Sequence, residues 1–296
     1  MSFTTPNSMN VELPSPVAVA CHDAGAANLI LAGLGAGWAR EWRACAEGPA
    51  RRRFLSLFPD HAVCATLVEA LRGAAALLSG TGWASSLEHE ARRLAREMGV
   101  FSVAVVDHWV NYPDRFVRNG EQVWPDEFWV TDVFAEDLAR DAFPGREVRR
   151  VPNHYFEQQL RDIRPAKSAD TTEILYVPEP AQSDWGRGVP GEFQALDYFI
   201  SCLNERGLSP MPTIRLRPHP SDPPGKYDAW LAANAQHPVM LDDAQDLAAA
   251  LSRADWVVGC ETAAMVLALE SGRTVYCSLP PWAPPCRLPH PGILPI

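Results

Sequence analysis

The chain alternates, twice over, between short apolar runs rich in β-branched residues and longer amphipathic stretches. This alternation is typical of βαβ units, in which each strand of a parallel sheet is followed by a crossover helix. We therefore expect an α/β protein. In the first half, strands are predicted over residues 17–21, 75–79, 101–106, 127–130 and 147–151, with helices over 26–34 and 87–98.

A second series follows a polar stretch, Pro165 to Thr172, that lacks apolar periodicity and is predicted to be a linker. The alternation then resumes over 174–178, 193–203, 213–217, 227–233, 238–241, 247–251, 256–259, 262–270 and 274–277. The two series predict two facing Rossmann-like domains with parallel sheets, residues 1–160 and 161–296. One continuous sheet is the alternative. The proline-rich segment 280–296 is predicted to pack as an extended strap.

Composition and charge narrow the functional classes. The most apolar N-terminal stretch, 17–34, is interrupted by His22, Asp23 and Asn28, and the first ten residues do not resemble a signal peptide. We therefore expect a cytoplasmic protein without a membrane span. A formal net charge of −10 argues against nucleic acid as a partner. The run 51–53 of three arginines is interpreted as a solvated loop, with an anionic acceptor or lipid contact as the alternative.

Seven cysteines are scattered along the chain with no Cys-x-x-Cys pair, which argues against a disulfide framework and against a zinc site. No metal is expected. In open parallel sheets, ligands bind beyond the carboxyl ends of the strands. That rule selects five loops that follow predicted strands, namely residues 22–25, 80–82, 107–109, 217–220 and 259–262.

Two of these loops carry groups suited to a phosphate. Thr262 and Ala263 begin a predicted helix whose N-terminus attracts an anion, although Thr262 is equally suited to capping that helix. Arg217 and His219 alternate with two prolines, which restrict the loop and hold both side chains in nearly fixed directions. This pair predicts an anion-binding site, and a stiff turn with a surface histidine is the alternative.

The motif Arg217-Pro218-His219-Pro220, followed by Glu261-Thr262-Ala263 and a helix ending near Arg273, resembles the nucleotide-binding half of GT-B glycosyltransferases. The likeness is to bacterial sialyl-, polysialyl- and capsular Kdo-transferases. It implies that His219 and Thr262 contact the donor phosphate, supported by Arg217, and that the donor is a CMP-activated acidic sugar. Ala263 stands where those families have a second serine. Leu267 stands near their ribose-binding glutamate, which leaves Glu261 as the substitute.

An inverting transferase also needs a base that deprotonates the acceptor hydroxyl. Asp23 is the predicted base, with His22 as its substitute, because the loop 22–25 resembles the acidic motif of the same transferases. Asp107 and His108 are the second choice; a role in capping or in shaping the loop is the alternative for both pairs. Gly25, Thr81 and Trp109 are assigned to the acceptor, with Trp109 stacking on a sugar face.

The leading hypothesis is a metal-independent, cofactor-free glycosyltransferase that moves a sugar from a nucleotide donor to a hydroxyl of a surface polysaccharide or glycoconjugate. A nucleotide-sugar hydrolase or 2-epimerase on the same fold is the second. A non-catalytic nucleotide-sugar-binding protein is the third, because the strap 280–296 replaces the terminal helices of many GT-B enzymes.

Overall fold

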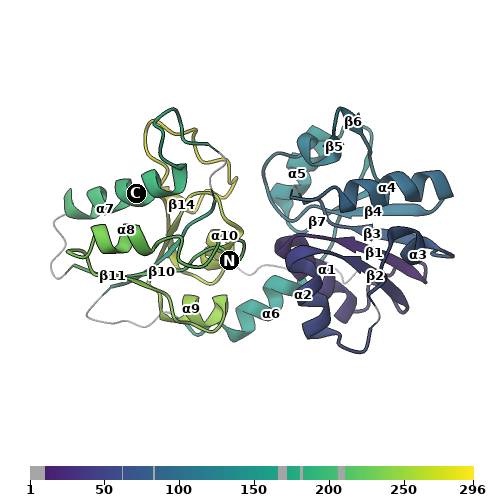
Figure 1. Ribbon diagram of the computed structural model, residues 1–296, viewed down its shortest axis with the longest axis horizontal. Coiled ribbons are helices and arrows are strands. Elements are labelled where there is room, and N and C mark those ends of the chain that lie inside the picture. Colours follow the sequence, from purple (N-terminus) through teal and green to yellow (C-terminus); the bar gives the residue numbers. More distant parts are fainter. Residues whose placement is uncertain (1–10, 62, 83, 166–171, 181–182, 206–210) are drawn as a thin grey trace. The chain divides into compact units, whose positions relative to one another are not determined.

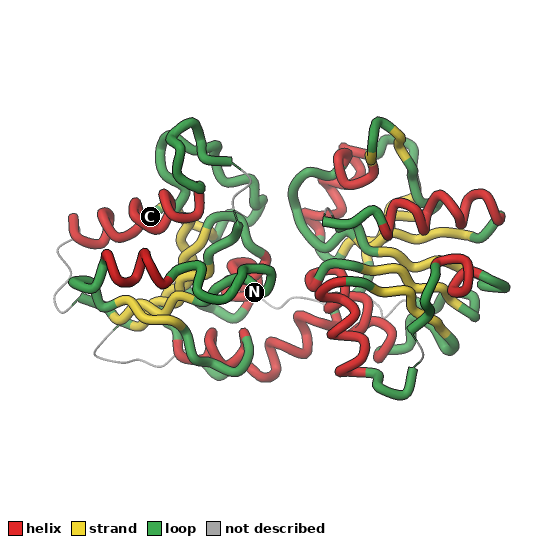
Figure 2. Tube along the Cα trace, in the orientation of Figure 1, coloured by secondary structure: helices red, strands yellow, loops and turns green. Residues whose placement is uncertain are grey.

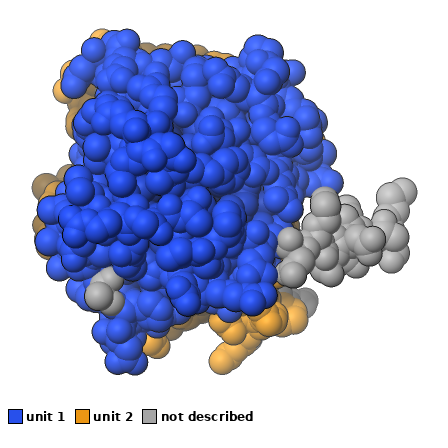
Figure 3. Space-filling model, turned by 90° about the vertical axis from the view of Figure 1, so that its right-hand side faces the viewer, with its two compact units in different colours: residues 1–155 blue, residues 156–296 orange. Residues whose placement is uncertain are grey.

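The computed structural model describes residues 11–61, 63–82, 84–165, 172–180, 183–205 and 211–296. It divides into unit 1, Met1–Tyr155, and unit 2, Phe156–Ile296, which Figure 3 colours separately. Helix α6 (His154–Asp162) contains the point of division. Of the predicted linker, residues 166–171 lie outside the described residues.

The described part of unit 1 contains a parallel sheet of six strands in the order β2-β1-β3-β4-β7-β8 (Figure 1). These strands are β1 (Val17–Cys21), β2 (Trp42–Ala46), β3 (Ala76–Ser79), β4 (Phe101–Val105), β7 (Glu127–Val130) and β8 (Glu147–Arg150). The helices are α1 (Ala24–Gly35), α2 (Gly48–Leu57), α3 (Leu67–Leu71), α4 (Leu87–Met98) and α5 (Val133–Ala142). A short 3-10 turn (Pro113–Phe116) precedes a hairpin of β5 (Val117–Arg118) and β6 (Glu121–Gln122).

Both faces of this sheet are covered, which explains why the central strand β1 is apolar and buried at every position and does not alternate. Val17 and Val19 of β1 belong to a buried cluster that includes α1 and α2, whereas Ala18 and Ala20 belong to another that includes α3 and α4. Figure 2 shows the strands as the inner layer of the unit, with helices outside.

Unit 2 repeats the architecture in its described residues, with six parallel strands in the order β11-β10-β9-β12-β13-β14. The strands are β9 (Glu173–Val177), β10 (Thr213–Leu216), β11 (Val239–Leu241), β12 (Trp256–Gly259), β13 (Thr274–Cys277) and β14 (Ile293–Pro295). The helices are α7 (Gly191–Glu205), α8 (Asp228–Ala233), α9 (Leu247–Arg253) and α10 (Ala263–Glu270). Two separate parallel sheets confirm the predicted fold class and exclude one continuous sheet.

Two local predictions were wrong. The arginines of 51–53 lie in α2 and not in a loop, because Ala50 and Phe54 of the same helix are buried against the sheet. Helix α1 begins at Ala24, because the backbone of Asp23 is extended and its carbonyl oxygen accepts the Ala27 N–H, so Gly25 belongs to the helix. The strap 280–296, predicted to be extended, ends in the strand β14, which pairs with β13.

Candidate functional site

The strand orders place a topological switch point in each unit. In unit 1 the chain goes from β1 to β2 on one side and then to β3 on the other, so the loops after β1 and β3 diverge at their carboxyl ends. In unit 2, β9 lies between β10 and β12 in the same way. Ligands of open parallel sheets bind at such points. The candidate loops of both units therefore lie at the edge where this architecture binds ligands.

Asp23 stands at the switch point of unit 1. It is the N-cap residue of α1, yet its side chain makes no capping hydrogen bond. Its Oδ1 instead lies 2.7 Å from His22 Nδ1, and its Oδ2 lies against Gly82 of the loop after β3. The Asp23 side chain is 30% exposed. A carboxylate in this position is accessible and is oriented by its neighbours.

His22 is held on two sides. Its backbone N–H donates to Glu88 Oε1 of α4 at 2.8 Å. Its imidazole packs against Gly48, where a Cβ would lie 2.5 Å from His22 Nε2. Because Nε2 faces Gly48 and Nδ1 faces Asp23, His22 is suited to orienting the Asp23 carboxylate.

Asp107 and His108 follow β4. Asp107 Oδ1 accepts a hydrogen bond from Arg115 Nη1 at 3.0 Å, and its Oδ2 packs against Gly25 in the first turn of α1. Burial raises the pKa of Asp107, the Arg115 charge opposes this, and the Asp23 charge raises the pKa further. The Asp107 side chain is 15% exposed and occupies the positive end of α1 itself. Of the two carboxylates, Asp23 is the more accessible.

Two acceptor assignments disagree with the structure. Trp109 is 5% exposed and its indole N–H donates to Asp132 Oδ2 at 2.8 Å, so the ring packs within unit 1 and offers no face to a sugar. Thr81 is fully buried, and its hydroxyl oxygen accepts a hydrogen bond from Arg115 Nη1 at 3.1 Å. Both side chains are buried and hydrogen-bonded within unit 1. Gly25, by contrast, is exposed.

The loop after β10 fixes the tautomer of His219. The backbone N–H of Ser221 donates to His219 Nδ1 at 3.2 Å, and the Ser221 hydroxyl lies 2.7 Å from the same nitrogen. Since Nδ1 accepts, the proton of the neutral imidazole resides on Nε2. The His219 Nε2–H is therefore a hydrogen-bond donor, which is the kind of group that binds an anion.

Arg217 is partly engaged by its own unit. Its Nη1 donates to the fully buried carboxylate of Asp242 and to the carbonyl oxygen of Ala244 at 3.1 Å. The Arg217 side chain is 23% exposed. Asp242 therefore fixes the guanidinium in place, and the supporting role assigned to Arg217 stays a prediction.

A buried ionic network supports the same loop. Lys226 Nζ lies 2.7 Å from Glu192 Oε1 and 2.7 Å from Asp222 Oδ1. The second oxygen of Asp222 accepts the His219 backbone N–H at 2.9 Å and the Tyr227 hydroxyl at 3.3 Å. The network links α7, the His219 loop and Tyr227, the N-cap residue of α8.

Helix α10 provides the second half of the predicted phosphate site. Thr262 is its N-cap residue and accepts the Ala264 N–H at 3.4 Å; the first turn, which begins at Ala263, contains no acidic residue. Both carboxylate oxygens of Glu261 accept hydrogen bonds from the Arg287 guanidinium: Oε1 from Nε at 3.1 Å and Oε2 from Nη2 at 2.6 Å. The Arg287 backbone N–H also donates to Oε1, at 2.6 Å. The strap thus binds the carboxylate that was assigned to ribose.

Cys260, in the loop before α10, lies close to two other cysteines, Cys277 and Cys286. The thiols of Cys277 and Cys286 approach the carbonyl oxygen of Cys260 at 3.3 and 3.6 Å. A hydrogen bond from the Cys277 thiol lowers the pKa of Cys286 to about 7, although burial opposes the shift. Cys286 is half-buried and is the thiol with the stronger thiolate character of this pair.

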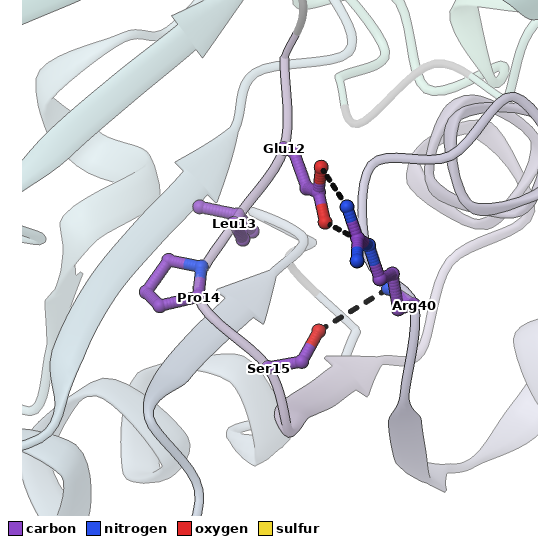
Figure 4. Close-up of a pocket in the computed structure, with 5 residues that line it drawn as sticks. All are labelled: Glu12, Leu13, Pro14, Ser15 and Arg40. Carbon is purple, nitrogen blue, oxygen red and sulfur yellow. Dashed lines mark hydrogen bonds and ion pairs between the residues drawn. The ribbon is translucent and has the colours of Figure 1, made fainter.

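A surface pocket lies elsewhere. It is lined by Glu12, Leu13, Pro14, Ser15 and Arg40, and the Arg40 guanidinium pairs with Glu12 across it at 2.6 Å (Figure 4). These residues precede β1 and β2, so the pocket lies at the amino edge of the sheet, opposite the candidate loops. Among the described residues, no helix has the length and apolarity to cross a membrane, and no cluster of three metal-ligating side chains occurs.

Solved structures resemble the chain in fold. A Listeria monocytogenes protein named as a UDP-N-acetylglucosamine 2-epimerase is 10% identical, with a TM-score of 0.53 over 88% of this chain and 78% of that one. S. aureus MnaA with UDP is 12% identical, with a TM-score of 0.58 over the same shares. The fold is GT-B-like. At these identities the likeness shows the fold alone, and no family model and no curated protein matches the chain.

Sequence reasoning missed the residues that support the loops: Glu88, Arg115, Lys226, Asp242 and Arg287. Glu88, Asp242 and Arg287 lie 66, 25 and 26 positions from the loop residues that they contact. Arg115 and Lys226 are nearer in sequence, 8 and 4 positions from Asp107 and Asp222. One signal was present in the sequence. Glu88 and Arg92, four residues apart, adjoin the apolar stripe of Leu87, Ala91 and Ala95, where charged residues are unusual.

Proposed function

We propose that the chain is a nucleotide-sugar enzyme in which unit 2 binds the nucleotide donor and unit 1 supplies Asp23 as general base toward a hydroxyl acceptor. The observation that supports it is the state of the Asp23 side chain: it stands at the N-cap of α1 without capping, is 30% exposed, and is paired with His22. A carboxylate that only stabilised its helix would accept the first-turn N–H groups.

The chemistry divides between the two units. Asp23 takes the proton of the acceptor hydroxyl as that oxygen attacks the sugar, while His22 keeps the carboxylate oriented. The leaving phosphate gains charge, which His219 Nε2–H, Arg217 and the N–H groups at the start of α10 are suited to stabilise.

Nucleotide binding is the first test. CMP, UDP, GDP, ADP and dTDP are compared by thermal shift, where a ligand at 100 times its dissociation constant adds about 2.7 kcal/mol. UDP is included because the similar MnaA structure contains it, and CMP because the motif 217–220 resembles that of CMP-sugar transferases. His219→Ala should weaken binding about tenfold or more. His237→Ala is the matched control, because His237 precedes β11 at the opposite edge of the sheet. Equal affinity in both variants would remove His219 from the site.

Turnover is the second test. Asp23→Asn should lower turnover by about 10²–10⁴-fold and leave nucleotide affinity unchanged. If Asp23→Asn and His22→Ala both keep full activity, Asp107 with His108 becomes the better choice of base.

A 2-epimerase or hydrolase activity is the second candidate, favoured by the structural likeness to the Listeria protein. The products separate the candidates: a transferase releases nucleotide only with an acceptor, a hydrolase releases it with water, and an epimerase alters the sugar. A wild-type protein that binds a nucleotide sugar and converts none would instead be a binding protein.

A further inference from the structure

Glu88 occupies an unusual place for a first-turn glutamate. Such residues commonly lie at the surface near the positive end of their helix. Glu88 of α4 is 1% exposed, and its Oε1 accepts the backbone N–H of His22 at 2.8 Å. The helix therefore extends a buried carboxyl group under the loop that carries the candidate base.

The surroundings of Glu88 fit this contact closely. A Cβ on Gly80 would lie 3.3 Å from Glu88 Oε1 and 2.8 Å from Ala26 Cβ, so Gly80 leaves room for the approach. Arg92, one turn further along α4, donates to Ser79 and Gly80 and not to the carboxyl group. Glu88 Oε2 is buried without a hydrogen bond among the described residues.

We propose that Glu88 is a positioning residue for Asp23: by holding the His22 amide, it fixes the direction in which the neighbouring carboxylate points. This inference rests on the proposed function, since it names the support of the same base. The chain reaches Asp23 one residue after the held amide, and His22 Nδ1 pairs with Asp23 Oδ1. A displacement of about 1 Å at a catalytic group can cost about 100-fold in rate.

The charged groups facing Glu88 are Asp23 on the loop after β1 and Arg92 on α4, with the thiol of Cys21 beside them. Burial raises the pKa of Glu88, the His22 N–H opposes this, and the Asp23 charge raises the pKa further. In its neutral form, Glu88 still accepts the amide proton. The hydrogen bond and not the charge is therefore the essential contribution.

Kinetics test the proposal through paired variants. Glu88→Ala should lower kcat about 10–100-fold at unchanged nucleotide affinity, and Glu88→Gln, which keeps an acceptor oxygen, should restore most of it. In an Asp23→Asn background, Glu88→Ala should lower kcat by less than about threefold, because a positioning residue acts through the group that it positions. Glu90→Ala is the matched control, since Glu90 lies on the same turn and pairs with Arg93 at 2.7 Å. A loss that is equal in both backgrounds would overturn the proposal.

A second measurement does not depend on activity. The chain has eight histidines, so selective ¹⁵N-histidine labelling gives few amide signals, and His22→Ala identifies the one from His22. In Asp23→Asn protein this signal should shift with pH as Glu88 ionises, and adding Glu88→Gln should remove the part of the shift that Glu88 causes. A His22 amide that ignores Glu88 would overturn the proposal. If the amide responds but no nucleotide binds and nothing turns over, the proposed function fails and the contact of Glu88 with the loop stands.

Discussion

Replacing Lys226 with methionine should destabilise unit 2 by about 3–5 kcal/mol, the usual cost of removing one partner from a buried ionic group. Lys226 Nζ lies 2.7 Å from both Glu192 and Asp222, whose side chains are 6% and 2% exposed. Methionine has a similar length but no charge, so two buried carboxylates would lose their shared cation. At about 4 °C per kcal/mol, the melting transition of this unit should fall by about 12–20 °C.

The pH dependence of this effect follows from the sign of the pKa shift. Burial by itself lowers the pKa of Lys226, but hydrogen bonds to Asp222 and Glu192 outweigh it and raise the pKa above its ordinary value. The stabilisation is therefore complete below about pH 10.4, the ordinary lysine value, and is lost only as the pH rises through the higher folded-state pKa. The difference between wild type and Lys226→Met should be constant between about pH 7 and pH 9.

Urea unfolding followed by tryptophan fluorescence and by far-ultraviolet circular dichroism would measure the effect. The exposed ion pair of Arg140 with Glu136 provides the control: Arg140→Met should cost less than about 1 kcal/mol. The variant Lys226→Met combined with Glu192→Gln and Asp222→Asn removes all three charges and should recover most of the loss. A single variant that loses less than about 1 kcal/mol, or a neutral triple variant that recovers nothing, would refute the electrostatic reasoning.

Two further predictions concern single positions. Gly25→Ala should destabilise unit 1 by about 1–3 kcal/mol although alanine favours helices, because the added Cβ would overlap Asp107 Oδ2. Gly35→Ala is the control: Gly35 lies at the end of the same helix, where a Cβ meets no other atom, so this change should be neutral or stabilising. Equal effects of the two substitutions in thermal melts would contradict the prediction. Iodoacetamide should modify Cys286 faster than Cys202 near pH 7, because thiolate is the reactive form. Peptide mass spectrometry of the quenched protein measures both rates, and a slower Cys286 would be the adverse result.

The sequence by itself determined the fold class and most of the strands. Parallel strands buried on both faces leave continuous apolar runs, so Val17–Cys21 and Trp256–Gly259 were recognisable without the structure. The strand Trp42–Ala46 was missed because an arginine and small residues interrupt its apolar run. The strand Ile293–Pro295 was missed because Pro291 lies just before it and Pro295 lies within it, and prolines argue against a sheet. The strand is tolerated because it lies at the edge of the sheet, beside β13.

The candidate loops were predictable for a similar reason, since polar residues that end an apolar strand lie at the carboxyl edge of the sheet. What these residues do there was decided by partners distant in sequence. Trp109 is turned inward by Asp132, and Glu261 is bound by Arg287. His22 is held by Glu88. Such contacts depend on which helices pack beside which strands, and a local pattern does not encode that order; only the tertiary structure brings a carboxyl group of α4 beneath the loop after β1.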